Sequence, residues 1–208
     1  IVAIEDERIY EHNGIDVRGI LRAFVKGVTN GLNFDEGAST LTQQLLKNNV
    51  FTNWTNEGKV ERFVRKFQEQ FLALELAETL TAQGKDAKSV ILENYLNTIN
   101  LGAGSYGVQA ASKRYFDKAA KDLTLSECAV LAAIPQSPTK YNPITNPDNN
   151  AERRATVLDK MLEQGYITEE AYQEAMADNV YDRIQEHNSA LPEPAPYSYF
   201  TDAVLSQI

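Results

Sequence analysis

The sequence is poor in the side chains that build disulfides and Cys/His metal sites. Its 208 residues include one cysteine, Cys128, and two histidines. A single cysteine excludes an internal disulfide and most cysteine-based metal sites, and two histidines argue against a His-rich zinc site. The redox compartment is left open by this composition.

Basic residues are also in the minority. Lys and Arg number 20 against 29 Asp and Glu, which gives a formal net charge of -9. Because binding to a nucleic-acid backbone depends on clustered Lys and Arg, this balance argues against nucleic acid as a partner. Any anionic ligand must therefore be held by a local basic cluster.

Long apolar runs are missing as well. A helix that spans a bilayer needs roughly 20 apolar residues, whereas the runs here are far shorter and no signal-peptide pattern is present. The chain starts at Ile1, within an apolar stretch, rather than at a methionine. We therefore expect a piece of a longer protein, whose membrane anchor this sequence would not include.

Helical spacing, by contrast, occurs almost throughout, and no stretch alternates convincingly as a strand. The longest example is KVERFVRKFQEQFLALELAETL, residues 59–80. Its apolar residues recur at intervals of three and four and form one stripe: Val60, Phe63, Val64, Phe67, Phe71 and Leu74. Leu72 and Leu76 fall on the opposite side, so we predict an amphipathic first half and a second half buried all round.

The other predicted helices are shorter. They cover Val17 to Thr29, Thr40 to Asn48, Ala87 to Asn97, Val108 to Tyr115, Leu125 to Ile134, Ala151 to Gln164 and Glu169 to Ala177. Capping-box patterns begin at Thr40 and at Thr124. The Pro-containing stretches 135–150 and 190–196 are predicted to be a loop and an extended linker. The sequence thus predicts a mainly α fold.

Two adjacent acids near the start of the chain are the first candidate for catalysis. Glu5 and Asp6 follow an apolar run in IVAIEDERIYEHNGID, so we expect the chain to deliver them from the core to a rim. Desolvation raises the pKa of a carboxyl group, as a general acid or base working near neutral pH requires. The alternative is a surface acid pair at the start of a turn.

A second candidate is a helix start in EGASTLTQQLLKNN. Residues 37–40 would expose backbone N–H groups and hydroxyls there, which suits phosphate or another anion. Gln44 and Lys47 project one turn apart, so an amide and an ammonium could face the same ligand. The alternative is an ordinary capped helix with its polar residues in solvent.

The third candidate is the charged sequence RKFQE. Arg65 and Glu69 lie four residues apart on the side opposite the Phe stripe, with Lys66 beside them. Such a pair usually belongs to a solvated helix face and contributes a few tenths of a kcal/mol. Here Leu72 and Leu76 continue the same side, and a charged patch that runs into an apolar wall is typical of a cleft. Both interpretations stay open at this point.

A glycine pattern in LGAGSYG is misleading. Gly102, Gly104 and Gly107 have the spacing of a dinucleotide-binding loop, which has meaning only between a strand and a helix. The preceding ILENYLNTIN is helical by its spacing. We therefore reject a nucleotide cofactor and predict a flexible connection with close backbone packing.

Five stretches of the chain together resemble one enzyme family. They are EDERIYEHNGID, EGASTLTQQLLKN, RKFQEQFLALELA, ILENYLNTINLGAGSYGVQAASKRYF and LTLSECAVLAAIPQSPTKYNP. Their order and spacing are similar to those of the five motif blocks of the peptidoglycan glycosyltransferases, found in class A penicillin-binding proteins and monofunctional transglycosylases. The resemblance is strong over about residues 1–145 and continues weakly beyond them.

The resemblance implies a mainly α, lysozyme-like fold with a larger head lobe and a small membrane-facing jaw lobe. The glycosyltransferase domain would cover residues 1–190, with the jaw at about 49–60. Residues 191–208 would be a linker toward a transpeptidase domain. The parent protein would carry an N-terminal transmembrane helix and work at the cell membrane, with this domain on the extracytoplasmic face.

The implied reaction is the polymerisation of lipid II into β-1,4 glycan strands, with inversion at the anomeric carbon and release of undecaprenyl diphosphate. Glu5 matches the general base and Glu69 the second essential glutamate, near the departing diphosphate. The substrate-binding positions matched by the motifs are Asp6, His12, Ser39, Thr40, Gln43, Gln44, Lys47, Asn48, Arg65 and Lys66. The implied partners are lipid II, the growing glycan strand and the membrane surface.

The family commonly uses Mg²⁺ or Mn²⁺, which would bridge the diphosphate near Glu69, with no certain protein ligand. Four positions depart from the usual motifs: Ile9, Ala38, Gln68 and Asp117. None of these departures removes a charged catalytic group.

Two other functions would suit parts of the pattern. A lysozyme-like hydrolase or lytic transglycosylase would share the fold and the acid but would have no use for Lys47, Arg65 and Lys66. A non-catalytic helical scaffold would leave Glu5 and Glu69 without a purpose.

Overall fold

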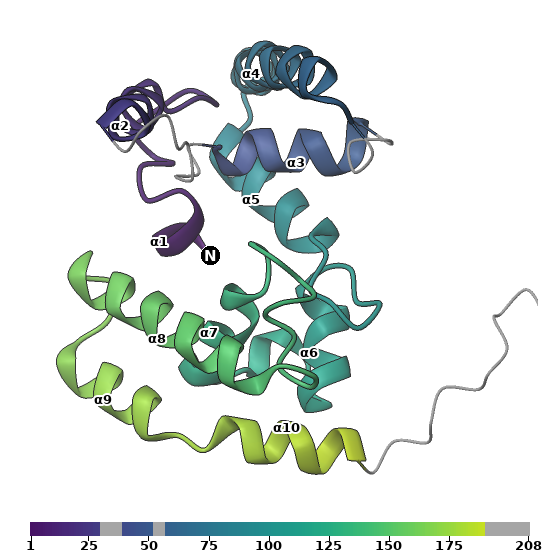
Figure 1. Cartoon of the computed structure of the whole chain (residues 1–208), viewed down its shortest axis with the longest axis vertical. Helices are drawn as coiled ribbons and strands as arrows, with labels where there is room; N and C mark the ends of the chain where they lie inside the picture. Colours follow the sequence, from purple (N-terminus) through teal and green to yellow (C-terminus); the bar gives the residue numbers. More distant parts are fainter. Residues whose placement is uncertain (30–38, 52–56, 190–208) are drawn as a thin grey trace, which may run out of the picture.

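The structure, a computed structural model, describes residues 1–29, 39–51 and 57–189 (Figure 1). The described residues are mostly helical and contain no strand, apart from an isolated bridge between Asn100 and Tyr106. In chain order the helices are α1 (Val2–Glu5), α2 (Val17–Thr29), α3 (Leu41–Val50), α4 (Lys59–Ala82), α5 (Ala87–Thr98), α6 (Val108–Phe116), the 3-10 helix η2 (Ala120–Asp122), α7 (Leu125–Ala133), α8 (Pro147–Glu163), α9 (Glu169–Ala177) and α10 (Val180–Ser189). The prediction of a mainly α protein is confirmed.

Most predicted helices are found within a few residues of their expected ends, and three differences are instructive. Helix α8 begins at Pro147, inside the stretch predicted to be a loop, because proline fits the first turn of a helix where its missing N–H costs nothing. The short helix α1 was not predicted. Helix α10 was not predicted either, because its buried face consists only of Val180 and Ile184.

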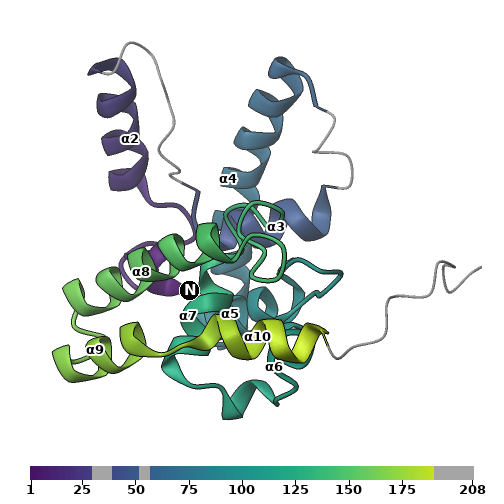
Figure 2. The ribbon, with the colours of Figure 1, turned by 60° about the horizontal axis from the view of Figure 1, so that its bottom comes forward.

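The helices form two groups joined by α5 (Figure 1). Helix α3 packs against α4 and α5, whereas α8 packs against α7 and α9, and α10 packs against α6. Figure 2 shows α2 and the first half of α4 projecting from the same side of the molecule. The predicted jaw at about 49–60 lies partly outside the described residues, so its boundary stays a prediction.

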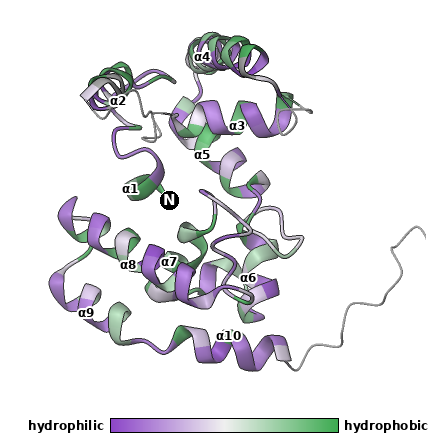
Figure 3. Ribbon diagram, viewed as in Figure 1, coloured by the Kyte–Doolittle hydropathy of each residue, from purple (hydrophilic) through white to green (hydrophobic). Residues whose placement is uncertain are grey.

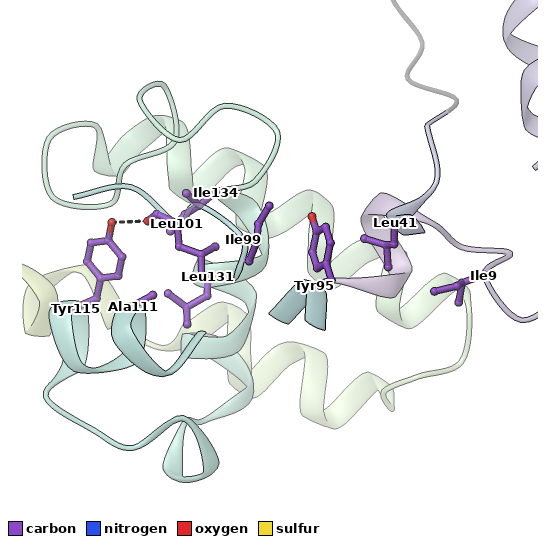
Figure 4. Packing of buried hydrophobic residues seen from close by; sticks show 9 residues of the cluster. All are labelled: Ile9, Leu41, Tyr95, Ile99, Leu101, Ala111, Tyr115, Leu131 and Ile134. Carbon is purple, nitrogen blue, oxygen red and sulfur yellow. Dashed lines mark hydrogen bonds between the residues drawn. The ribbon is translucent and has the colours of Figure 1, made fainter. Parts of the chain in front are cut away.

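The largest core cluster connects the two groups (Figure 4). Its buried members come from the first block, from α3, α5, α6 and α7, and from residues that follow α5 and α7: Ile9, Leu41, Tyr95, Ile99, Leu101, Ala111, Tyr115, Leu131 and Ile134. Burial of a large aliphatic side chain stabilises a fold by roughly 1.5–3 kcal/mol. The first motif block and α3 are therefore held against the same core.

Helix α1 is anchored between this core and α8. Ile4 packs into the second buried cluster beside Val157 and Leu158 of α8. The carbonyl oxygen of Ala3 accepts a hydrogen bond from Gln164 Nε2 at 2.9 Å. These contacts fix the position of the last residue of α1, which is Glu5.

Helix α4 is amphipathic as predicted, but its apolar stripe faces outward and its second half corrects a prediction. Val60 and Phe71 are 77% and 68% exposed, and the residues of the stripe between them are exposed too. The charged side, with Arg65 and Glu69, is the buried side. The second half is not buried all round, because Glu75 is exposed as well. Spacing shows which residues share a face but not which neighbour covers it.

Two glycines permit close backbone contacts. Gly14 has φ of 93°, and a Cβ there would lie 2.3 Å from the carbonyl oxygen of Ala73 in α4. Gly107 has φ of 80°, and a Cβ would lie 2.4 Å from the carbonyl oxygen of Asn97. The latter confirms the predicted close backbone packing at Gly107, in a loop that connects two helices rather than a strand and a helix. The predicted flexibility of this loop stays a prediction.

Candidate active site

Glu5 lies in a cleft and not on an open surface. Its side chain is 11% exposed. The cleft has a volume of about 330 Å³ and is also lined by Asp6, Ser39 and Thr40. Since Asp6 is buried, the two acids do not form a surface pair, and the alternative interpretation of the opening stretch is wrong.

The two carboxylate oxygens of Glu5 have different surroundings. Oε2 accepts a hydrogen bond from Gln44 Nε2 at 3.0 Å. Oε1 is buried, accepts no hydrogen bond from the described residues, and lies 3.8 Å from Arg153 Nη2. A buried oxygen without a hydrogen bond is costly unless a ligand completes it. Oε1 is therefore the carboxylate oxygen of Glu5 that the described residues leave without a hydrogen bond.

Asp6 organises the protein around the cleft. Its Oδ2 accepts a hydrogen bond from the backbone N–H of Leu41 at 2.9 Å, which satisfies a free donor at the start of α3. Its Oδ1 lies 2.9 Å from His12 Nε2, and both side chains are largely buried. The carboxylate thus joins the first motif block to α3, the helix that carries Gln44 and Lys47.

The residues predicted to bind an anion at the start of α3 have different hydrogen-bond partners. Thr40 and Gln43 form the predicted capping box: Thr40 Oγ1 accepts from the N–H of Gln43 at 3.2 Å, and Gln43 Oε1 accepts from the N–H of Thr40 at 2.9 Å. Thr40 Oγ1 also donates to the carbonyl oxygen of Gly14 at 2.6 Å, so the cap is tied to the first motif block. Ser39 is half-buried and accepts a hydrogen bond from Lys66 Nζ at 2.8 Å, and Gly37 and Ala38 lie outside the described residues.

A buried network of opposite charges lies on the inner face of α4. Glu69 is fully buried, and its two oxygens accept hydrogen bonds from Arg65 Nη1 and, at 2.9 Å, from Lys66 Nζ. Arg65 is 7% exposed and also donates from Nε to the carboxylate of Glu57, at 2.6 and 2.9 Å. The burial of Arg65 and Glu69 therefore excludes the solvated helix face, and the cleft interpretation of RKFQE stays a prediction.

Lys47 connects this network electrostatically to Glu5. Burial lowers the pKa of its amine, and repulsion by Lys66 and Arg65 lowers it further. The charges of Glu69 and Glu5 act in the opposite direction. Lys47 is thus within electrostatic reach of both carboxylates. Asn48, the next predicted residue of α3, is exposed.

Three residues of the site were not predicted from the sequence. Glu57 pairs with Arg65, Arg153 approaches Glu5 from α8, and Tyr95 donates a hydrogen bond to Gln44 from α5. Tyr95 lies within the fourth motif block, so the motif resemblance could have identified it. Arg153 lies in α8, beyond the last motif block, and nothing in its local sequence distinguishes it.

The chemistry of the site does not fit a protein-held divalent ion. The described residues contain no group of three or more His, Cys, Asp or Glu that could hold a metal. Both oxygens of Glu69 are engaged by cations, so this carboxylate is poorly suited to ligate another. The expected Mg²⁺ or Mn²⁺ stays a prediction about an ion carried by the diphosphate, and no step below depends on it.

These features define a class of protein: a helical protein in which the largely buried carboxylate of Glu5 lines a cleft, and Ser39 of the same cleft accepts a hydrogen bond from Lys66 of the cation cluster. The sequence model of the family described as Transglycosylase matches residues 1–162, so the chain belongs to this family. Its activity is accordingly that of a peptidoglycan glycosyltransferase, and its helical architecture fits the expected lysozyme-like fold.

Named relatives agree with this family. The chain is 41% identical to penicillin-binding protein 1A of Clostridium acetobutylicum over 215 residues, which cover 100% of the chain and 26% of that protein. It is 46% identical to penicillin-binding protein 1F of Bacillus subtilis over 167 residues, which cover 80% of the chain and 22% of that protein. The chain therefore spans about a quarter of the length of these curated relatives.

One similar solved structure is penicillin-binding protein 1A from Haemophilus influenzae. The match has 45% sequence identity and a TM-score of 0.44, and it covers 45% of the chain and 14% of that protein.

Proposed function

We propose that this peptidoglycan glycosyltransferase polymerises lipid II into β-1,4 glycan strands, with Glu5 as the general base. The observation that carries this proposal is the asymmetry of the Glu5 carboxylate. Gln44 holds Oε2, whereas Oε1 is buried and accepts no hydrogen bond from the described residues. A positioned carboxylate oxygen of this kind can take the proton of an acceptor hydroxyl.

The proposed step is a single in-line displacement. The acceptor sugar oxygen bonds to the anomeric carbon of the donor while its proton passes to Glu5 Oε1. The bond between that carbon and the diphosphate oxygen breaks, and its electron pair leaves with undecaprenyl diphosphate. Because the donor is α-linked, one displacement yields a β-linked product, and no covalent enzyme intermediate is required.

The cation cluster would stabilise the departing diphosphate. Lys47, Arg65 and Lys66 lie near one another, and Glu69 holds the last two through hydrogen bonds. Fixed cations in a partly dry site stabilise developing negative charge by roughly 3 kcal/mol for each well-placed donor. Ser39 accepts from Lys66 and lines the cleft with Glu5, so it joins the proposed leaving-group site to the base.

The proposed function also requires a surface that contacts the membrane, because lipid II is anchored in a bilayer. Helix α2 exposes Val17, Leu21 and Val25, and α4 exposes the apolar stripe that begins at Val60. Both helices project from one side of the molecule (Figures 2 and 3). Contiguous exposed apolar faces of this kind suit insertion into an interface. None of the described helices has the length and apolar character needed to cross a bilayer. We place this surface at the extracytoplasmic face.

The replacement Glu5→Gln tests the role of the base. It keeps the shape of the side chain but removes its basicity, so polymerisation of lipid II should fall by about a hundredfold to ten-thousandfold. Glu11→Gln, an exposed acid of the same block, is the matched control and should retain activity. Strand length and released undecaprenyl diphosphate are measured together with the thermal unfolding midpoint.

Other outcomes of the same assay would contradict the proposal. Shortening of preformed glycan without strand growth would support a lysozyme-like hydrolase or lytic transglycosylase. Unchanged polymerisation by Glu5→Gln would exclude Glu5 as the base.

A further inference from the structure

A chain of hydrogen bonds connects the core to Glu5. Tyr95 Oη donates to Gln44 Oε1 at 3.0 Å, and Gln44 Nε2 donates to Glu5 Oε2 at 3.0 Å. The three side chains come from α5, α3 and α1. Tyr95 is a member of the largest core cluster and is 1% exposed (Figure 4).

The chemistry of the Gln44 amide determines which of its atoms donates and which accepts in these hydrogen bonds. A glutamine side chain carries an acceptor oxygen and a donor nitrogen, whereas an ionised carboxylate only accepts. The observed orientation pairs each donor with an acceptor. Rotating the Gln44 amide by half a turn would place its oxygen against the Glu5 carboxylate and leave the Tyr95 hydroxyl without its acceptor.

We propose that Tyr95 is a positioning residue that acts through Gln44 on the base Glu5. Its hydroxyl fixes the amide so that the nitrogen holds Oε2 and leaves Oε1 directed to the acceptor hydroxyl. This inference rests on the proposed function. It adds a residue that touches no substrate and comes from a buried helix.

The phenol is suited to this task because it stays protonated. Burial raises the pKa of Tyr95 well above its ordinary value, and the charge of Glu5 raises it further. The hydroxyl therefore remains a donor over the whole range in which the enzyme can work. Its ring is buried in the same cluster as Leu41 and Ile99 (Figure 4), so packing restrains the position of the hydroxyl that bonds the amide.

The test compares two tyrosines that differ in what they contact. Tyr115 is also buried in this cluster, and its hydroxyl donates to the carbonyl oxygen of Leu101 at 2.7 Å. Tyr95→Phe and Tyr115→Phe each remove one buried hydrogen bond, so they should lower the unfolding midpoint by similar amounts. We expect Tyr95→Phe to lower kcat for lipid II about tenfold, with KM changed less than about twofold. Tyr115→Phe should leave kcat unchanged.

A double-mutant cycle separates action through Gln44 from a structural effect. If Tyr95 works only through the amide, Tyr95→Phe should lower kcat no further in a Gln44→Met background. Equal kcat values for Tyr95→Phe and Tyr115→Phe, or additive effects with Gln44→Met, would overturn the inference. Glu5→Gln in the same assay reports on the base itself. If that variant is inactive and Tyr95→Phe matches its control, the inference fails and the proposed function stands.

Discussion

The charge of Lys47 depends on its surroundings more than that of an exposed lysine does. Burial lowers the pKa of its amine, and Lys66 and Arg65 lower it further. The ammonium form is the one that attracts a diphosphate. We therefore expect kcat/KM for lipid II to fall on the alkaline side as Lys47 loses its proton, below the value of about 10.4 for a free lysine.

The variant Lys47→Arg tests whether Lys47 causes the alkaline fall in kcat/KM. A guanidinium stays charged throughout this range, so the alkaline fall in kcat/KM should move to higher pH in the variant. The profile is recorded from about pH 7 to about pH 10. Superimposable alkaline limits in the two proteins would show that another group controls them.

At the same scale, the sequence proposed residues for the site, but it could not show which atoms they use or that Glu57, Tyr95 and Arg153 lie beside them. Thr40 and Gln43 match a substrate-binding pattern, yet in the structure they form the capping box of α3, and Thr40 also donates to the carbonyl oxygen of Gly14. Glu69 was expected near the diphosphate, and its oxygens hold Arg65 and Lys66. Hydrogen-bond partners depend on which groups compete for each atom, and those competitors come from distant parts of the chain.

At the scale of elements, α4 is unusual because it faces the protein with charge and the outside with apolar residues. Phe71 of this outer face is 68% exposed and contributes little to the core. We expect Phe71→Gln to change the free energy of unfolding by less than about 0.5 kcal/mol, as other exposed substitutions do. If the face meets a membrane, the same variant should bind more weakly to vesicles of phosphatidylcholine and phosphatidylglycerol in equal parts.

The control is another exposed aromatic residue outside α2 and α4. Tyr166 is exposed beyond the end of α8, so Tyr166→Gln should bind these vesicles as the wild type does. Co-sedimentation with the vesicles measures all three proteins. Equal binding of Phe71→Gln and wild type would count against a membrane role for this face.

At the scale of the whole molecule, an ion network fixes the junction of α7, α9 and α10. Arg183 donates to both oxygens of Asp178, at 2.6 and 2.8 Å, and also lies 3.5 Å from the buried Glu127. The hydrogen bonds from Arg183 outweigh burial and lower the pKa of Asp178 from 3.8 to about 2. A carboxyl pKa that is lower in the folded state makes folding more favourable above the unfolded value.

The lowered pKa of Asp178 makes the stability of the fold depend on pH in the acid range. The stabilisation by Asp178 is fully present above about pH 3.9 and is lost as the pH falls toward about 2. Arg183→Met should therefore be less stable than wild type near pH 7, by on the order of 1 kcal/mol after allowing for solvent screening. Its stability should also depend less on pH between about 4 and 2. Urea unfolding at several pH values measures both effects, and parallel curves would contradict them.

The sequence by itself determined the helical class, most helix positions, the negative overall charge and the ordered motif blocks that carry Glu5 and Glu69. These features are local: spacing along one helix fixes which side chains share a face, and a motif needs only neighbouring residues. Only the tertiary structure decided that the charged face of α4 points inward, that Oε1 of Glu5 is left without a hydrogen bond by the described residues, and that Tyr95 and Arg153 converge on the same site. Those outcomes depend on which distant segments pack together, because burial and hydrogen-bond partners are properties of contacts and not of spacing.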